Sequence, residues 1–237
     1  MTFKFFKQHR PLKQTTIDSY YKQIAPRTTN NLKIWHININ SLNTSHSALK
    51  ERVELQTPKP DIIGVSETKN PKGRAIHHIP GYTAHHNDAE SGSRGTAIYA
   101  REDLKSQEIQ IRHKTKTKKD RFTAITMLDS TLIEAYAPVD CTKENEREDF
   151  YEDLNFIIEE CRQAYPRNRI IVMGDMNAHV AGYYSEETND NGRLLLRTCR
   201  EQALAIAPFQ GPTFERGDSK TAVDYILTDR QSYNDIT

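Results

Sequence analysis

Short apolar runs recur along this chain, and each is closed by a polar residue or a turn. Apolar and polar positions alternate over 32–39 (LKIWHINI), while 61–67 (DIIGVSE) and 95–101 (GTAIYAR) are compact apolar runs. Segments of this length that are rich in β-branched and aromatic residues are typical of strands. The same pattern predicts a hairpin over 121–138 and a buried strand over 170–174 that ends at an aspartate.

Helical spacing marks three further segments. Apolar residues four apart predict a helix over 46–57, and six apolar residues on one face predict a longer helix over 147–165, which Pro166 stops. A polar loop precedes a third helix over 189–202, and two strand candidates follow it: 213–216 and 221–227. This order of strands and helices predicts a layered α/β domain with mixed sheets.

The first thirty residues differ from the rest in pattern and in charge. They lack a sustained apolar period and contain six basic residues and one acid, a net +5, which leaves −4 for the remainder of a chain whose total is +1. We therefore expect a flexible basic tail over 1–30 and a folded domain over 31–237. A basic tail favours binding to nucleic acid or to an acidic partner surface. The small negative charge of the remaining chain is equally well explained as ordinary surface variation.

Composition argues against several protein classes. No apolar run approaches the roughly 18 residues of a membrane span, and the N-terminus lacks the apolar core of a secretory signal. The cysteines Cys141, Cys161 and Cys199 lie far apart without Cys-x-x-Cys spacing, which argues against a disulfide framework or a zinc site. We expect a reducing compartment and no membrane partner.

Polar residues of the kind that bind metal or phosphate lie at or near the ends of five predicted strands. These residues are Asn38, Asn40, Glu67, Tyr136, Asp175, Asn177 and Asp224. In open α/β architectures, ligands collect at strand ends and in the loops beyond them. One such residue means little, whereas five strands that each deliver one predict a shared site.

The residue types fit hydrolysis of a phosphodiester next to a hard cation. Mg²⁺, with Mn²⁺ as the alternative, takes oxygen ligands, so Glu67 is a candidate direct ligand and Asn38 offers an uncharged amide oxygen. Asn40 either supports this metal site or forms a turn beside Ser41. Asp175 is a candidate general base for the attacking water.

Two more residues complete the expected chemistry. Asn177 can orient the water or the phosphate, and Tyr136 can donate a hydrogen bond to a phosphoryl oxygen. His179 closes the motif GDMNAH, and we expect it to be a polar residue that follows the site rather than a catalytic one.

Seven motifs together resemble a known family. In this order, HININSL, SETK, GTAIYAR, EAYAP, GDMNAH, PTFER and AVDYIL are similar to the endonuclease/exonuclease/phosphatase superfamily over about residues 32–230. Within it, the chain looks most like the apurinic-endonuclease-like domain of non-LTR (LINE-type) retrotransposons. The resemblance implies a four-layer α/β sandwich of two facing mixed β-sheets flanked by helices. It also implies Mg²⁺-dependent nicking of DNA in the nucleus, which leaves a 3′-hydroxyl primer for a downstream reverse transcriptase domain.

The resemblance assigns roles to individual residues. Asn38 and Glu67 match the metal site of the family, and Tyr136 matches its phosphate-binding tyrosine. Asp175 and Asn177 match the aspartate and asparagine of its Gly-Asp-x-Asn signature.

Two departures from the family pattern stand out. The apurinic enzymes often have an asparagine where this chain has Val139, which weakens the case for repair of abasic sites. Asp224 matches the aspartate that orients the histidine of a Ser-Asp-His triplet, but the sequence reaches Thr237 without that triplet. We expect a catalytically incomplete domain that lacks its C-terminal strand and leaves a sheet edge unpaired, as a fragment or as a decayed copy.

DNA contacts are expected from two further segments. Thr213 and Phe214 match a family segment near the DNA-binding groove. The basic run 113–121 offers Lys116 and Lys118 to phosphates, although such a run is more often a solvated hairpin.

A separate motif lies within the basic tail. Gln14, Ile17, Tyr20 and Tyr21 fit the box by which ligands bind the replication sliding clamp, PCNA. The last three lie three and four residues apart, so one helical turn would gather them into an apolar plug. The alternative is a chance match.

Two rivals to a DNA endonuclease remain open. One keeps the fold but changes the substrate, to a phosphatase or an RNA-cleaving member of the superfamily. The other is a domain that binds DNA or the clamp without cutting.

Overall fold

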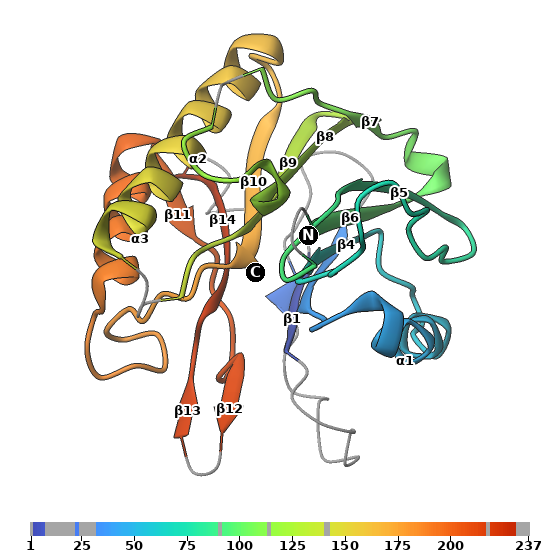
Figure 1. Cartoon of the computed structure of the whole chain (residues 1–237), viewed down its shortest axis with the longest axis horizontal. Coiled ribbons are helices and arrows are strands. Elements are labelled where there is room, and N and C mark those ends of the chain that lie inside the picture. The colour runs from blue at the N-terminus through green and yellow to red at the C-terminus, as the bar shows by residue number, and fades with distance from the viewer. Residues whose placement is uncertain are drawn as a thin grey trace.

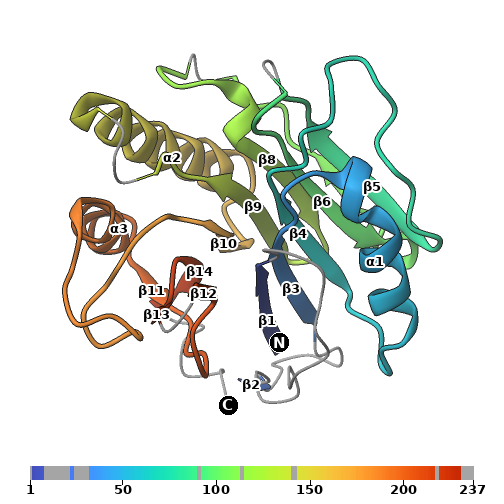
Figure 2. The same cartoon turned by 60° about the horizontal axis from the view of Figure 1, so that its bottom comes forward.

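The structure of the protein is a computed structural model. The structure describes residues 2–7, 22–23, 32–89, 92–112, 115–139, 143–216 and 219–230. These residues form two β-sheets that pack face to face, with helices on the two outer sides (Figures 1 and 2). None of the described helices has the length and apolar character needed to cross a membrane.

The first sheet contains the N-terminal strands. They are β1 (Thr2–Lys7), β2 (Lys22–Gln23), β3 (Lys33–Asn38), β4 (Ile62–Ser66), β5 (Tyr82–Asn87) and β6 (Thr96–Arg101). Their order is β2-β1-β3-β4-β6-β5; β1, β3 and β4 are parallel and the other pairs are antiparallel. Helix α1 (Leu42–Glu54) covers the outer face of this sheet (Figure 2).

The second sheet contains most of the remaining strands. They are β7 (Gln107–Glu108), β8 (Phe122–Met127), β9 (Ser130–Tyr136), β10 (Arg169–Asp175), β11 (Leu204–Ile206) and β14 (Asp224–Asp229). Their order is β11-β14-β10-β9-β8-β7, with only β9 and β10 parallel. Helices α2 (Glu144–Ala164) and α3 (Asp190–Glu201) lie on its outer side (Figure 2).

Four short elements complete the fold. Strands β12 (Phe214–Arg216) and β13 (Ser219–Thr221) pair as a separate hairpin that projects from the sandwich (Figure 1). Two single turns of 3₁₀ helix, Glu102–Leu104 and Lys119–Arg121, precede β7 and β8.

Within the described part of the chain, three apolar clusters fill the spaces between the layers. Ile34 and Ile171 belong to the cluster between the two sheets, Trp35 to the cluster under α1, and Phe150 to the cluster under α2 and α3. The domain is therefore a four-layer α/β sandwich with two mixed sheets. This confirms the fold expected from the sequence.

Strand β3 shows how the sandwich presents polar residues. Successive side chains of a strand point to opposite faces. Trp35 and Ile37 pack under α1, whereas Ile34 packs between the sheets. His36 and Asn38, both buried, share the face of Ile34 and therefore point toward the second sheet.

The first thirty residues differ from the expected tail in part. Strand β1 pairs with β3 along Thr2–Lys7, and Lys22–Gln23 pairs with β1, so both segments belong to the first sheet. The sequence pattern TFKFFK is too short for a sustained period, but an exposed strand edge favours any segment that can satisfy its backbone groups. The proposed clamp-binding box, Gln14 to Tyr21, lies outside the described residues.

Other boundaries shift for local reasons. The helix expected over 46–57 begins at Leu42, because the Leu42 amide donates to the carbonyl of Thr68 and no side chain caps the helix. The strand expected over 221–227 divides between β13 and β14. Strands β5, β7 and β11 are not predicted from the sequence. The free thiols Cys161 and Cys199 are both buried.

Candidate active site

Several strands end in an unusual backbone conformation at one edge of the sandwich. Five residues after β3, β4 and β10 have positive φ without being glycine: Asn40 (48°), Ser41 (101°), Glu67 (53°), Lys69 (50°) and Asn177 (45°). Each such residue costs on the order of 1–3 kcal/mol and persists only where surrounding structure holds it. Strain of this kind often marks a functional site, and here it coincides with the residues selected from the sequence.

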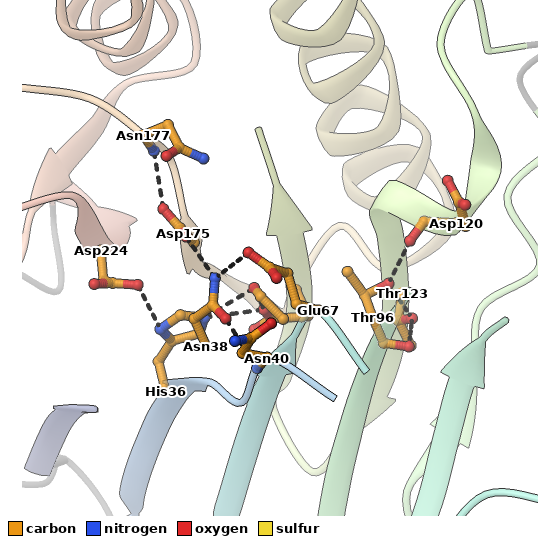
Figure 3. A network of polar contacts seen from close by, with 12 residues as sticks. His36, Asn38, Asn40, Glu67, Thr96, Asp120, Thr123, Asp175, Asn177 and Asp224 are labelled. Atoms are coloured by element: carbon orange, nitrogen blue, oxygen red, sulfur yellow. Dashed lines mark hydrogen bonds and ion pairs between the residues drawn. The ribbon is translucent and has the colours of Figure 1, made fainter. Parts of the chain in front are cut away.

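Asn38 connects the two sheets at this edge (Figure 3). Its Nδ2 donates to Glu67 Oε1 at 2.9 Å and to Asp175 Oδ2 at 2.8 Å. The Tyr136 hydroxyl donates to the same Oε1 of Glu67 at 2.9 Å. The structure thus brings together four residues from four strand ends, as the sequence predicts.

The carboxylate of Asp175 is fully buried and held from both sides. Oδ2 accepts from Asn38, and Oδ1 accepts from the backbone amide of Asn177 at 3.1 Å. The side-chain amide of Asn177 donates to the carbonyl of Ala137 at 3.0 Å, which ties the GDMNAH loop to the end of β9. The backbone amide of Asn177 therefore fixes the Asp175 carboxylate, and its side-chain amide fixes the loop against the end of β9.

A lysine that was not selected from the sequence joins the cluster. The ammonium of Lys69 donates to Asn40 Oδ1 and lies 3.4 Å from Glu67 Oε2. Asn38 Oδ1 accepts from the Asn40 backbone amide at 3.2 Å, so Asn40 contacts both Asn38 and Lys69. Asn40 thus belongs to the hydrogen-bonded cluster and lies at a bend in the chain.

The cluster suits a hard cation with few protein ligands. Among the described residues no group of three or more His, Cys, Asp or Glu side chains is arranged to hold a metal ion. Mg²⁺ often binds through one or two carboxylates and keeps several waters, so a larger group is not required. Glu67 suits the role of a metal ligand, because its carboxylate is partly exposed and lies 3.4 Å from the ammonium of Lys69.

Tyr136 is supported by a buried arginine from the segment before β8. The Arg121 guanidinium donates to the Tyr136 carbonyl at 2.9 Å and lies 5.7 Å from the centre of its ring. Burial, and then the Glu67 carboxylate, raise the pKa of Tyr136. The hydroxyl therefore keeps its proton near neutral pH and remains a hydrogen-bond donor.

Asp224 lies in a second, fully buried network beside the first (Figure 3). It pairs in register with Asp175, and its Oδ1 lies 3.5 Å from His36 Nδ1. His36 Nε2 lies 3.1 Å from Glu134 Oε1, to which Ser66 Oγ also donates at 2.6 Å. The structure thus adds three residues beside Asp224 that were not selected from the sequence.

Charge and burial oppose each other in this network. Burial lowers the pKa of His36, but the neighbouring carboxylates, Glu134 first, raise it by more, and the pKa lies above its ordinary value. Burial raises the pKa of Glu134, and the opposing effect of His36 does not cancel that rise. The two side chains are therefore best described as one buried pair.

The remaining predicted residues lie around the cluster rather than in it. Thr213 Oγ1 accepts from the backbone amides of Val223 and Asp224, so it fixes the start of β14. Phe214 opens the β12–β13 hairpin. The backbone amide of His179 donates to Asn189 Oδ1, which anchors the start of α3. The backbone of His179 thus helps to hold the N-terminus of α3 in place.

The basic run before β8 is tied to helix α2. The Lys116 ammonium pairs with Glu152 and with Asp149 of α2, and its backbone amide donates to Asp153. Lys118 is exposed in the same loop. These acids compete with any phosphate for Lys116, and the structure does not bring it to the cluster.

The matching family model covers most of this chain. The Endonuclease/Exonuclease/phosphatase family model matches residues 35–234. No curated protein matches the sequence.

Solved structures with the same fold include three nucleases. The 3′-5′ exonuclease NExo from Neisseria meningitidis is 17% identical with a TM-score of 0.68, over 84% of this chain and 88% of that one. The AP endonuclease LMAP from Leishmania major is 13% identical with a TM-score of 0.67, over 88% and 85%. The endonuclease domain of TRAS1, a telomere-specific non-LTR retrotransposon, is 19% identical with a TM-score of 0.61, over 84% and 86%.

Proposed function

This chain belongs to the Endonuclease/Exonuclease/phosphatase family, and we propose that it is a metal-dependent endonuclease that nicks duplex DNA. One observation carries this proposal: Asn38 joins Glu67 and Asp175 from opposite sheets at a strained edge of the sandwich. In that arrangement the proposed cation ligand, Glu67, and the proposed general base, Asp175, would act side by side, as hydrolysis of a phosphodiester requires.

The proposal extends to the setting of a non-LTR retrotransposon. The TRAS1 endonuclease domain is among the similar structures, and the motifs of this chain resemble that class of domain. In this setting the nick leaves a 3′-hydroxyl that primes reverse transcription in the nucleus, with a reverse transcriptase as the partner domain. Thr213 and Phe214, at the base of the projecting hairpin, are the proposed DNA contacts (Figure 1).

The residues of the cluster divide the chemistry among them. Glu67, with Asn38 and Asn40 beside it, would hold Mg²⁺ or Mn²⁺, and the bound ion would supply positive charge that stabilises the phosphoryl transition state. Asp175 accepts the proton of the attacking water, and the hydrogen bonds from Asn38 and Asn177 fix the direction of its carboxylate.

Tyr136 and Lys69 stabilise charge at the phosphate. The Tyr136 hydroxyl, now directed at Glu67, is placed to donate to a phosphoryl oxygen. The ammonium of Lys69 lies beside the same carboxylate and offsets negative charge at this edge.

A panel of substrates tests the proposal against its rivals. We expect duplex DNA to be cut with Mg²⁺ or Mn²⁺ and not with EDTA, and RNA and phosphomonoesters to react more slowly. Faster turnover of RNA or of a phosphomonoester would assign another activity of the family. Binding of DNA without any cut would identify a non-catalytic module.

Replacing Glu67 by Gln is expected to weaken Mn²⁺ binding by about tenfold or more, because loss of even an indirect metal partner costs that much. Titration of bound Mn²⁺ by electron paramagnetic resonance measures the change. Glu102→Gln is the matched control: Glu102 is exposed and follows β6 at the end opposite Glu67. Equal affinity of Glu67→Gln and the control for Mn²⁺ would remove Glu67 from the metal site.

The clamp-binding box is a separate proposal, carried by the sequence alone. We expect immobilised PCNA to retain the wild-type chain and to lose a variant with Tyr20→Ala and Tyr21→Ala, because the two rings would belong to the proposed apolar plug. Equal recovery of the two proteins would contradict the assignment.

A further inference from the structure

His36 is clamped between carboxylates from the opposite sheet. It projects from β3, whereas Glu134 lies on β9 and Asp224 on β14. Nε2 lies 3.1 Å from Glu134 Oε1. Nδ1 lies 3.5 Å from Asp224 Oδ1 (Figure 3). All three side chains are fully buried. An imidazole with a carboxylate beside each ring nitrogen is favoured in one orientation.

The surroundings of Glu134 are built to keep it against His36. Burying a carboxylate is costly unless it is paired and hydrogen-bonded. Ser66 Oγ donates to Glu134 Oε1 at 2.6 Å and lies 3.1 Å from His36 Nε2, so it contacts both members of the pair. Gly64 supplies the space, because a Cβ added there would lie 2.3 Å from Glu134 Oε2.

The other side of the imidazole faces the acids of the proposed active site. Asp175 and Asp224 are register partners on β10 and β14. Two neighbouring carboxylates repel each other unless hydrogen-bond donors or positive charge offset them. Asn38 donates to Asp175, and His36, two residues earlier on the same face of β3, contacts Asp224. One strand thus provides a separate partner for each acid.

We propose that His36 is a positioning residue for the proposed hydrolysis: it fixes the Asp224 carboxylate beside Asp175, and Glu134 with Ser66 fixes His36. The inference rests on the proposed function for its kinetic consequence. His36 lies below the exposed edge and acts through Asp224 rather than through DNA or the metal ion. Its removal therefore affects the chemical step and not the binding of substrate.

Kinetics of His36→Gln separate this role from substrate binding. We expect kcat to fall by about tenfold or more while KM for DNA stays within about twofold, because only transition-state geometry is lost. Added to Asp224→Asn, the substitution should produce little further loss, since its effect passes through Asp224. The proposal is overturned if His36→Gln lowers kcat as much in the Asp224→Asn background as it does alone. It is also overturned if His36→Gln raises KM and leaves kcat unchanged.

Two variants guard against a trivial failure to fold. Ser66→Ala removes one contact of the imidazole and no charge, and we expect a smaller fall in kcat in the same direction. His85→Gln is the matched control, because His85 is partly buried, contacts Ser106 Oγ at 2.9 Å and lies outside the site. Wild-type kcat in Ser66→Ala, or a fall in His85→Gln equal to that in His36→Gln, counts against a specific role.

An observation that needs no activity completes the test. With ¹⁵N-labelled histidine, the His36 ring resonances are identified by their absence in His36→Gln. We expect Asp224→Asn to shift the Nδ1 resonance, because that nitrogen faces the Asp224 carboxylate. An unchanged resonance overturns the proposal even in an active nuclease. A shifted resonance in a chain that cuts no DNA supports the contact and overturns the proposed function alone.

Discussion

Asp175→Asn is expected to abolish DNA nicking while the fold is retained. The variant keeps the size of the side chain, but an amide has one acceptor oxygen where the carboxylate accepts from both Asn38 and Asn177. It also has no basic group for the proton of the attacking water. Loss of a general base that also organises its neighbours lowers the rate by roughly a thousandfold or more.

Single-turnover cleavage of an end-labelled duplex measures this loss, with circular dichroism as the check on folding. Asp129→Asn is the matched control. Asp129 is 58% exposed and pairs with Arg169 at the opposite end of β10 from Asp175. We expect wild-type rates from the control. An Asp175→Asn variant that cuts within about tenfold of wild type would show that another group is the base.

The second large effect is structural and comes from Gly174, the residue before Asp175. A Cβ added there would lie 1.8 Å from the backbone oxygen of Ala135, its register partner on β9. No rotamer change relieves a contact with backbone, so Gly174→Ala must separate β9 from β10. We expect a loss of about 3 kcal/mol or more in the free energy of unfolding, at the upper end for overpacking.

Urea unfolding compares Gly174→Ala with a control that isolates the clash. Gly182→Ala adds a Cβ where no atom lies within 4 Å, in a loop with φ of +87°, so its cost is conformational and about 1 kcal/mol. Because Tyr136 and Asp175 directly follow the displaced residues, the Gly174 variant should also lose activity. Equal stability of the two variants would contradict the close packing of β9 on β10.

The sequence was most informative where a strand ends. Asn38, Glu67, Tyr136 and Asp175 each interrupt or follow an apolar run, and the structure connects all four. A polar residue at such a position is visible without knowledge of the fold. The four-layer sandwich was likewise predictable, because the order of strands and helices and the family motifs agree.

His36 and Glu134 were missed for a tertiary reason. Both lie inside strands, two residues before Asn38 and Tyr136, at positions that face the opposite sheet. Polar residues at that spacing were a signal of a shared face. The pairing itself joins residues 98 apart in the sequence, and no local pattern specifies it.

The N-terminal strand and the basic run show the same limit. Strand β1 belongs to the sheet because the edge of β3 accepts its backbone, which depends little on its side chains. Lys116 looked available to phosphates in the sequence, but acids on α2, more than thirty residues later, pair with it. A charged residue in a sequence does not reveal which residue it pairs with in the fold.

Relaxation of a supercoiled plasmid, followed by extension of the nick, tests the central claim most directly. We predict Mg²⁺-dependent conversion to open circles by the wild-type chain, no conversion in EDTA or with Asp175→Asn, and ends that a DNA polymerase extends without phosphatase treatment. DNA that is bound but stays supercoiled, or nicks that persist in EDTA, would contradict a metal-dependent endonuclease centred on Asn38, Glu67 and Asp175.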